Sequence, residues 1–201
     1  MARSAAAIDI NDFELPGAFT AKQAETAGLS RALRARLVEE GAVTCFAKGL
    51  YRRATSREPV DLDLLEVALR SPRATICLAS ALARHGLTDE IPSAIDLALP
   101  RGFWRPTAPP VARWHSFAPA TFDIGRDLLP VDNGRCVGLY GAERSIIDAF
   151  HTRGTTGADL AVEALRKWLR RQGSQPAQLL AMAARWPRAQ APLQRALEIL
   201  L

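Results

Sequence analysis

The sequence predicts an α+β fold, in which an N-terminal winged helix-turn-helix precedes a mixed α/β domain that ends in a helical bundle. Two observations lead to this prediction. Residues 20–53 place two short helical patterns, a tight turn and two strand patterns in succession. Residues 93–140 then show several strand patterns, and three amphipathic helical patterns follow from residue 157 to the end of the chain.

The chain has 201 residues, of which 48% are hydrophobic, and this is enough for a packed core in one or two domains. No apolar run approaches the roughly 18 residues that span a bilayer, and Asp9 interrupts the N-terminal apolar stretch. We therefore expect a cytoplasmic protein without a membrane partner. Cys45, Cys77 and Cys136 lie far apart without a CxxC pattern, so we expect three buried thiols rather than disulfides or a zinc site.

Positive charge is concentrated near the N-terminus. The whole chain has a formal net charge of +5, and residues 17–57 alone carry eight basic and three acidic residues. A local basic surface is typical of nucleic-acid-binding proteins, because cations on the protein release counterions from phosphates.

Helix-capping residues define the N-terminal elements. Thr20 can cap a first helix that Gly28 ends, and Ser30 can cap a second helix that runs to Gly41. Residues 42–46 and 50–53 are strand patterns, and Gly49 can take a positive φ in the turn between them. This order predicts a winged helix-turn-helix DNA-binding domain over residues 1–57.

In such a domain the second helix enters the major groove, where arginine can donate two hydrogen bonds to guanine. We expect its three arginines to be exposed. The predicted DNA-contacting residues are Thr20, Lys22 and Gln23 beside the first helix, Ser30, Arg31, Arg34 and Arg36 on the second, and Lys48, Arg52 and Arg53 on the wing. The expected partner is double-stranded DNA with an inverted-repeat operator, read by a homodimer. A basic helical hairpin packed on the larger domain is the alternative.

A second domain is predicted over residues 60–201, after the polar segment TSREPV at 55–60. Helices are expected at 61–70, 75–86, 142–151, 157–171, 175–186 and 190–201, and strands at 93–100, 111–117, 121–125 and 136–140. The apolar residues of the first C-terminal helix recur at helical spacing and are predicted to belong to the core: Leu160, Ala164, Leu165, Trp168 and Leu169.

The sequence offers little that indicates catalysis. It contains no GxxxxGK[ST], GxGxxG or GxSxG pattern, and His85, His115 and His151 lie apart without metal-ligand spacing. Asp61 and Asp63 stand at a helix start, which favours capping over a magnesium site. Glu143, Arg144 and Asp148 are expected to form a structural ion-pair network. We therefore predict no catalytic residue, no metal and no cofactor.

Residues 17–53, GAFTAKQAETAGLSRALRARLVEEGAVTCFAKGLYRR, resemble the winged-helix domain of the AbiEi antitoxins, from the abortive-infection type IV toxin–antitoxin systems of bacteria. SALARHGLTDEIPSAIDLALPRG at 80–102, followed by GAERSIIDAF at 141–150, resembles the antitoxin domain of the same family. The resemblance implies a phage-defence antitoxin. Such a protein represses its own operon through the N-terminal domain, and its C-terminal domain neutralises a toxin with a nucleotidyltransferase fold.

The candidate toxin-facing surface is the proline-rich loop PRGFWRPTAPP, with Phe103 and Trp104 as anchors between Arg101 and Arg105. The same loop could instead pack on its own core.

Two other functions of the protein remain open. The C-terminal domain could be an enzyme that covalently modifies the toxin, for instance by phosphoryl transfer, although Asp61, Asp63, Asp89 and Asp96 lack a recognisable motif. Alternatively, the protein is a stand-alone transcriptional regulator.

Overall fold

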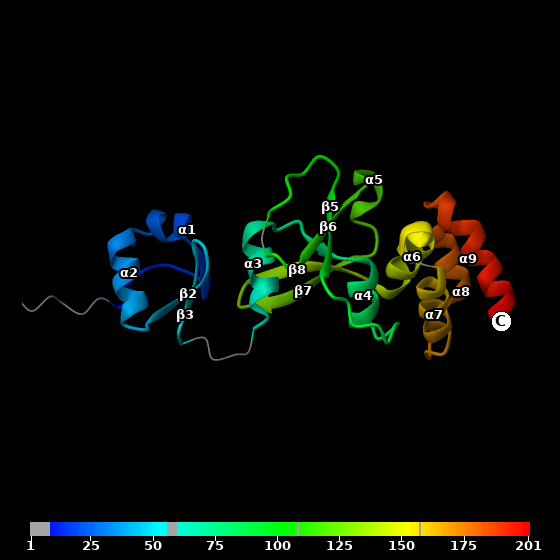
Figure 1. The fold of residues 1–201 in the computed structure, drawn as a ribbon, viewed down its shortest axis with the longest axis horizontal. Coiled ribbons are helices and arrows are strands. Elements are labelled where there is room, and N and C mark those ends of the chain that lie inside the picture. The colour runs from blue at the N-terminus through cyan, green and yellow to red at the C-terminus, as the bar shows by residue number, and fades with distance from the viewer. Residues whose placement is uncertain (1–8, 56–59, 108, 157) are drawn as a thin grey trace, which may run out of the picture. The chain divides into compact units, whose positions relative to one another are not determined.

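The computed structural model describes residues 9–55, 60–107, 109–156 and 158–201, which form a mixed α+β protein with two sheets (Figure 1). The predicted α+β class is confirmed.

The chain divides into two compact units, Met1–Pro72 with Pro130–Cys136, and Arg73–Leu129 with Val137–Leu201. The helix predicted at 61–70 therefore groups with the first unit. Residues 56–59 of the predicted linker lie outside the described residues.

Two short helices of the first unit begin at the predicted caps. Helix α1, Ala21–Thr26, starts with a capping box, in which Thr20 Oγ1 accepts from Gln23 N at 3.1 Å and Gln23 Oε1 accepts from Thr20 N at 2.9 Å. Helix α2, Arg31–Glu39, starts where Ser30 Oγ accepts from Leu33 N at 3.3 Å. A 3-10 turn, η1 (Ile10–Asp12), precedes them.

Three antiparallel strands complete the N-terminal part of this unit: β1 (Ala18–Thr20), β2 (Val43–Ala47) and β3 (Leu50–Arg53), in the order β1-β3-β2. Gly49 takes a φ of +75° in the turn between β2 and β3, as predicted. Strand β1 was not predicted, because its three residues run directly into the cap of α1. One cluster of buried apolar residues forms the core of this part, made of Ile10, Phe19, Ala24, Leu29, Leu37 and Val43.

Helix α3, Leu62–Arg70, buries Leu64, Leu65, Val67 and Ala68. Asp61 Oδ1 accepts from Leu64 N at 3.1 Å, so the predicted capping role of Asp61 is confirmed.

A five-stranded sheet has the order β6-β5-β4-β8-β7. Its strands are β4 (Thr75–Ile76), β5 (Ile95–Pro100), β6 (Ala112–Phe117), β7 (Arg126–Asp132) and β8 (Arg135–Tyr140). Strand β4 pairs antiparallel with β5 and parallel with β8, and β5 pairs parallel with β6. Because β5 and β6 are parallel neighbours, the chain between them must return along the sheet.

Two expectations for this region were wrong, and one strand was missed. The helix predicted over 75–86 begins only at Leu78, as α4 (Leu78–Arg84), because Thr75 and Ile76 join the sheet. The strand predicted over 121–125 is instead the end of helix α5 (Pro119–Phe122), which begins at a proline, followed by a turn at Gly125 with φ +65°. Strand β7 was not predicted, since charged residues and Pro130 mask its pattern.

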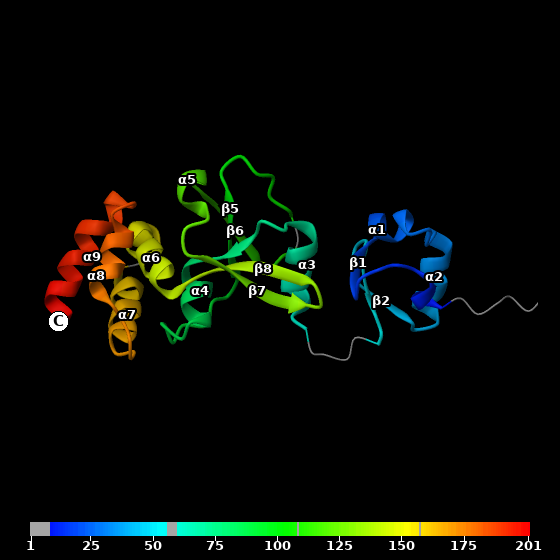
Figure 2. The ribbon, with the colours of Figure 1, turned by 180° about the vertical axis from the view of Figure 1, so that it is seen from behind.

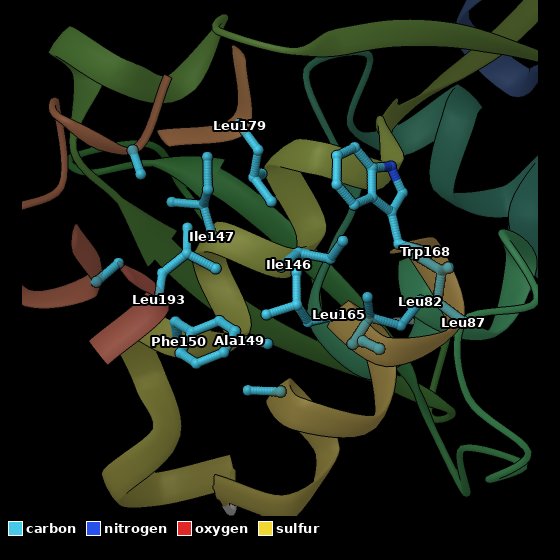
Figure 3. Packing of buried hydrophobic residues seen from close by; sticks show 14 of the residues in the cluster. Leu82, Leu87, Ile146, Ile147, Ala149, Phe150, Leu165, Trp168, Leu179 and Leu193 are labelled. Carbon is cyan, nitrogen blue, oxygen red and sulfur yellow. The ribbon is translucent and has the colours of Figure 1, made fainter. Parts of the chain in front are cut away.

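Four helices follow the sheet: α6 (Ala142–Thr156), α7 (Ala158–Leu169), α8 (Pro176–Ala183) and α9 (Pro187–Leu200). Figures 1 and 2 show them packed together. Figure 3 shows their shared core, in which Ile146 and Ile147 of α6 meet Leu165 and Trp168 of α7 and Leu179 of α8. The predicted core positions of α7 are confirmed, with Leu169 partly buried.

The predicted ion pair on α6 is present and buried. Arg144 Nε donates to Asp148 Oδ1 and Oδ2, each at 3.0 Å. Glu143 takes no part in this pair; its Oε1 accepts from Trp168 Nε1 at 3.2 Å.

The expectation of three buried thiols was wrong for Cys45, which is exposed on β2. Cys77 is buried, and Cys136 is half-buried. Among the described residues, no helix is long and apolar enough to cross a membrane.

Candidate functional site

Three cations of the first unit are exposed and make no ion pair within the described part of the chain: Lys22, Arg31 and Lys48. All three belong to the predicted DNA-contacting set. Unpaired cations retain their full charge for an external partner, so these residues define the candidate interface. We call them the cationic surface residues.

Arg31 is the first residue of α2, and the neighbouring exposed positions Ala32 and Ala35 carry only methyl groups. Small side chains beside an exposed arginine allow a partner to approach this face closely. Arg36, farther along the helix, is half-exposed, and its Nε donates to Glu40 Oε1 at 2.7 Å. Arg36 therefore has part of its charge compensated locally, whereas Arg31 does not.

Lys22 and Lys48 flank a single backbone contact. Ala21 N donates to Gly49 O at 2.8 Å, which fixes the turn of the β2–β3 hairpin against the start of α1. Arg70 Nη2 also donates to Lys48 O at 3.1 Å. The hairpin turn and the N-terminus of α1 are thus held together, and both present an exposed lysine.

The expectation that Arg34 is exposed was wrong. Its side chain is only 4% exposed, and Nη1 donates to the backbone carbonyls of Ala21 at 3.2 Å and Leu29 at 2.9 Å. Its Nη2 donates to Glu25 Oε1 at 3.0 Å, and its guanidinium lies 5.6 Å from the ring centre of Tyr51. Arg34 therefore holds α1 and α2 together, and we remove it from the candidate interface.

The guanidinium groups of Arg52 and Arg53 also have partners within the first unit. Arg53 donates to Asn11 Oδ1 at 2.7 Å, Phe13 O at 3.0 Å and Leu15 O at 2.8 Å. Arg52 Nε lies 3.6 Å from Asp132 Oδ2. Their predicted wing contacts with phosphate compete with these internal interactions.

Thr20 and Gln23 are half-buried, and both are used in the capping box of α1. Gln23 Oε1 also lies 3.5 Å from Arg135 Nη2. Ser30 is exposed at the cap of α2, directly before Arg31. Contacts of these three residues with DNA stay predictions.

In the second unit, the predicted toxin-facing residues lie on the connection between β5 and β6, which extends away from the sheet (Figure 2). Trp104 is 74% exposed and Phe103 is 53% exposed. Arg101 is exposed, and the exposed Arg105 donates to Ser116 Oγ. The alternative that this aromatic pair packs on its own core does not hold, and we call residues 101–105 the aromatic loop.

The described residues contain no group of histidine, cysteine and carboxylate side chains that could hold a metal ion. His85 Nε2 lies 2.7 Å from Tyr140 O, and His115 Nε2 lies 2.8 Å from Asp96 Oδ1, so each has a structural partner. Ser80 Oγ lies 3.5 Å from Asp96 Oδ2. The Ser80 hydroxyl also donates to Ala94 O at 3.2 Å and accepts from Asp96 N at 2.8 Å, so it is used in backbone hydrogen bonds.

The geometry defines a two-unit α+β protein with three exposed, unpaired cations among the described residues of its first unit and an exposed aromatic loop in its second. Neither a protein family nor a curated protein matches this chain. Its fold is similar to that of the RV2827C protein from Mycobacterium tuberculosis, with a TM-score of 0.50 over 92% of this chain and 76% of that chain. At 18% identity, the similarity is one of fold alone.

Proposed function

We propose that this protein is the DNA-binding antitoxin of a bacterial toxin–antitoxin system. Its first unit acts as a winged helix-turn-helix that represses its own operon, and its second unit neutralises a nucleotidyltransferase-like toxin without catalysing a reaction. The observation that carries the DNA-binding part is the unpaired, exposed Arg31 at the start of α2, with Lys22 and Lys48 beside the hairpin contact.

The order of elements supports this proposal. Helices α1 and α2 are joined by a short turn in which Gly28 has φ +83°, and the β2–β3 hairpin follows. In helix-turn-helix proteins, the N-terminal residues of the second helix contact base edges, and cations outside the groove contact phosphates. Arg31 fits the first role, and Lys22 and Lys48 fit the second. Because Arg34 is buried and excluded from the interface, Arg31 is the principal candidate for base recognition.

Arg31→Ala is expected to weaken binding to the operator upstream of the gene by about 1–3 kcal/mol, because a bidentate arginine–guanine contact has this value. Stability should change by less than about 0.5 kcal/mol, because the side chain is exposed. Fluorescence anisotropy with operator and scrambled duplexes, together with thermal unfolding, measures both quantities. Arg195→Ala, at an exposed position of α9, is the control for loss of one positive charge.

Lys48→Ala provides the contrast within the same experiment. It should weaken binding to operator and scrambled duplexes similarly and reduce the salt slope by about one. Operator affinity that is unchanged by Arg31→Ala would exclude Arg31 from recognition. A footprint over one asymmetric half-site would contradict an operator read by a dimer.

The aromatic loop supports the antitoxin part of the proposal. Large exposed aromatic side chains are enriched among residues that dominate protein–protein binding energy, and arginines often accompany them. Phe103 and Trp104 lie between Arg101 and Arg105, whose charges suit an acidic protein surface. Nothing in the core requires these two rings, since both are more than half exposed.

A Phe103→Ala/Trp104→Ala double variant is therefore expected to lose protection against the toxin encoded by the neighbouring gene, while its thermal stability stays unchanged. Growth rescue during toxin expression measures protection, with antitoxin levels checked by immunoblot. An Ile91→Ala variant, at a position 94% exposed outside the loop, is the matched control. Full protection by the double variant would exclude the aromatic loop.

The alternative that the second unit is an enzyme that covalently modifies the toxin is tested by incubating this protein and the purified toxin with γ-labelled ATP. A stoichiometric inhibitor leaves the toxin unlabelled. Label on the toxin that depends on the antitoxin would overturn the proposed binding mechanism. If no toxin gene adjoins this one, the stand-alone regulator becomes the better account.

A further inference from the structure

The second unit contains a cavity of about 330 Å³, and Arg101 is the one residue named in the proposed function that borders it. It is bordered by Arg101 after β5, by the end of β6, by α6, and by Arg185 in the connection between α8 and α9. Three arginines, at 101, 144 and 185, border it against a single carboxylate, Asp148. The excess of positive charge indicates an anionic occupant.

The charge of Arg144 is paired with that of Asp148, but one of the hydrogen-bond donors of Arg144 is unsatisfied. The side chain is 1% exposed. Its Nε donates to Asp148, and its Nη1 donates to Thr121 O at 2.6 Å and Ile124 O at 2.7 Å. Its Nη2 has no hydrogen-bond acceptor in the described residues. A buried donor without an acceptor is costly, and a charged one more so, so an acceptor supplied from the cavity would stabilise this group.

The two other arginines are available to a ligand. Arg101 and Arg185 are exposed and make no ion pair within the described ranges. Asp148 cannot compensate them, because both of its oxygens already accept from Arg144. His151 also borders the cavity, and burial together with Arg188 and Arg144 lowers its pKa, which disfavours the charged ring. The lining is therefore cationic.

The remaining walls are suited to an organic group. Phe117 and Trp186 border the cavity, and Pro187 lies beside Trp186. The Arg144 guanidinium covers part of both rings, at 5.6 Å from the ring centre of Phe117 and 4.4 Å from that of Trp186. The volume lies at the lower end of the range for small-molecule sites, which is about 300–1,000 Å³. It is larger than one inorganic oxyanion requires. Planar guanidinium groups bind phosphate oxygens in a bidentate manner, which gives phosphate an advantage over chloride.

We propose that this cavity binds a small phosphomonoester, with its phosphate held by Arg101, Arg185 and Arg144 and its organic part against Phe117 and Trp186. This site is independent of the cationic surface residues of the first unit. Arg101 belongs to both this cavity and the aromatic loop, so a bound ligand would lie directly beside the proposed toxin-facing surface.

Isothermal titration calorimetry of the full chain, with phenyl phosphate at constant ionic strength, tests the proposal. We expect one saturable site per chain, and an affinity for inorganic phosphate about tenfold lower, because that ion lacks an organic part. Arg185→Ala and Arg101→Ala should each weaken phenyl phosphate binding about tenfold by removing a charge-assisted hydrogen bond. Phenyl phosphate should also raise the unfolding temperature.

Arg195→Ala removes an exposed arginine of α9 that does not border the cavity, and it should leave the affinity unchanged. Absence of saturable binding would overturn the proposal, as would equal affinities of the wild type, Arg185→Ala and Arg101→Ala. Equal affinities for phenyl phosphate and inorganic phosphate would overturn the assignment of an organic ester. These results do not depend on DNA or toxin binding, so the two proposals can fail separately.

Discussion

Replacement of Arg144 by methionine is expected to lower the free energy of unfolding of the second unit by about 3–5 kcal/mol. Methionine has a similar length but donates no hydrogen bond. The substitution leaves the carboxylate of Asp148, which is 2% exposed, without its charged partner. The carbonyls of Thr121 and Ile124 also lose their donor. Removal of one member of a buried ion pair is more costly than removal of an exposed one.

Urea unfolding followed by tryptophan fluorescence measures this effect. All four tryptophans, at 104, 114, 168 and 186, belong to the second unit, so their emission reports on that unit. Arg195→Met is the matched control at an exposed position and should change stability by less than about 0.5 kcal/mol. Equal stabilities of the wild type and Arg144→Met would show that the buried pair contributes nothing.

The stability lost in Arg144→Met should depend on pH. Burial raises the pKa of Asp148 from 3.8 to about 6, although the charge and hydrogen bonds of Arg144 lower it. A raised pKa in the folded state gives stability that is fully present below pH 3.8 and is lost as the pH rises through about 6. Without Arg144 the pKa should rise further, so the deficit of Arg144→Met should be largest above pH 6.

An Asp148→Asn substitution in the Arg144→Met background removes the titrating group. This double variant should be more stable than Arg144→Met at pH 8, because no carboxylate is left buried and unpaired. Its stability relative to the wild type should also vary less between pH 5 and 8. A deficit of Arg144→Met that stays constant over this range would contradict the assignment to Asp148.

Local features of the fold could be predicted from the sequence because the interactions that cause them are local. The caps at Thr20, Ser30 and Asp61 each involve a residue three positions away, and the turn at Gly49 depends on one residue's conformational freedom. Strands β1 and β4 could not be predicted. They have three and two residues, and their existence depends on pairing with β3, β5 and β8, which are distant in the sequence.

The candidate site also depends on contacts between residues that are distant in the sequence, which the sequence alone does not reveal. The sequence correctly placed Arg31 on an exposed face, but it could not show that Arg34 would find carbonyl acceptors 13 and 5 residues away. One signal was present, since Arg34 lies three residues before Leu37 and therefore on the buried face of α2. The cavity beside Arg144 also had no sequence pattern, because its arginines come from separate elements.

Arg34→Ala is expected to lower the free energy of unfolding of the first unit by about 2–4 kcal/mol. Two buried carbonyls, at Ala21 and Leu29, would lose a charged donor, and a cavity would form beneath Tyr51. The pair with Glu25 adds little, because that carboxylate is 62% exposed. Arg31→Ala, three positions earlier on the same helix, is the matched control without a stability loss.

Because the first unit contains no tryptophan, hydrogen exchange of the α2 amides in the full chain is the suitable measurement. Arg34→Ala should lose protection at residues 31–39 and lose DNA affinity with it, whereas Arg31→Ala should lose operator affinity with protection intact. Unchanged protection in Arg34→Ala, combined with weaker operator binding, would return Arg34 to the recognition surface. The two arginines therefore separate the stability of the helix pair from its proposed recognition of DNA.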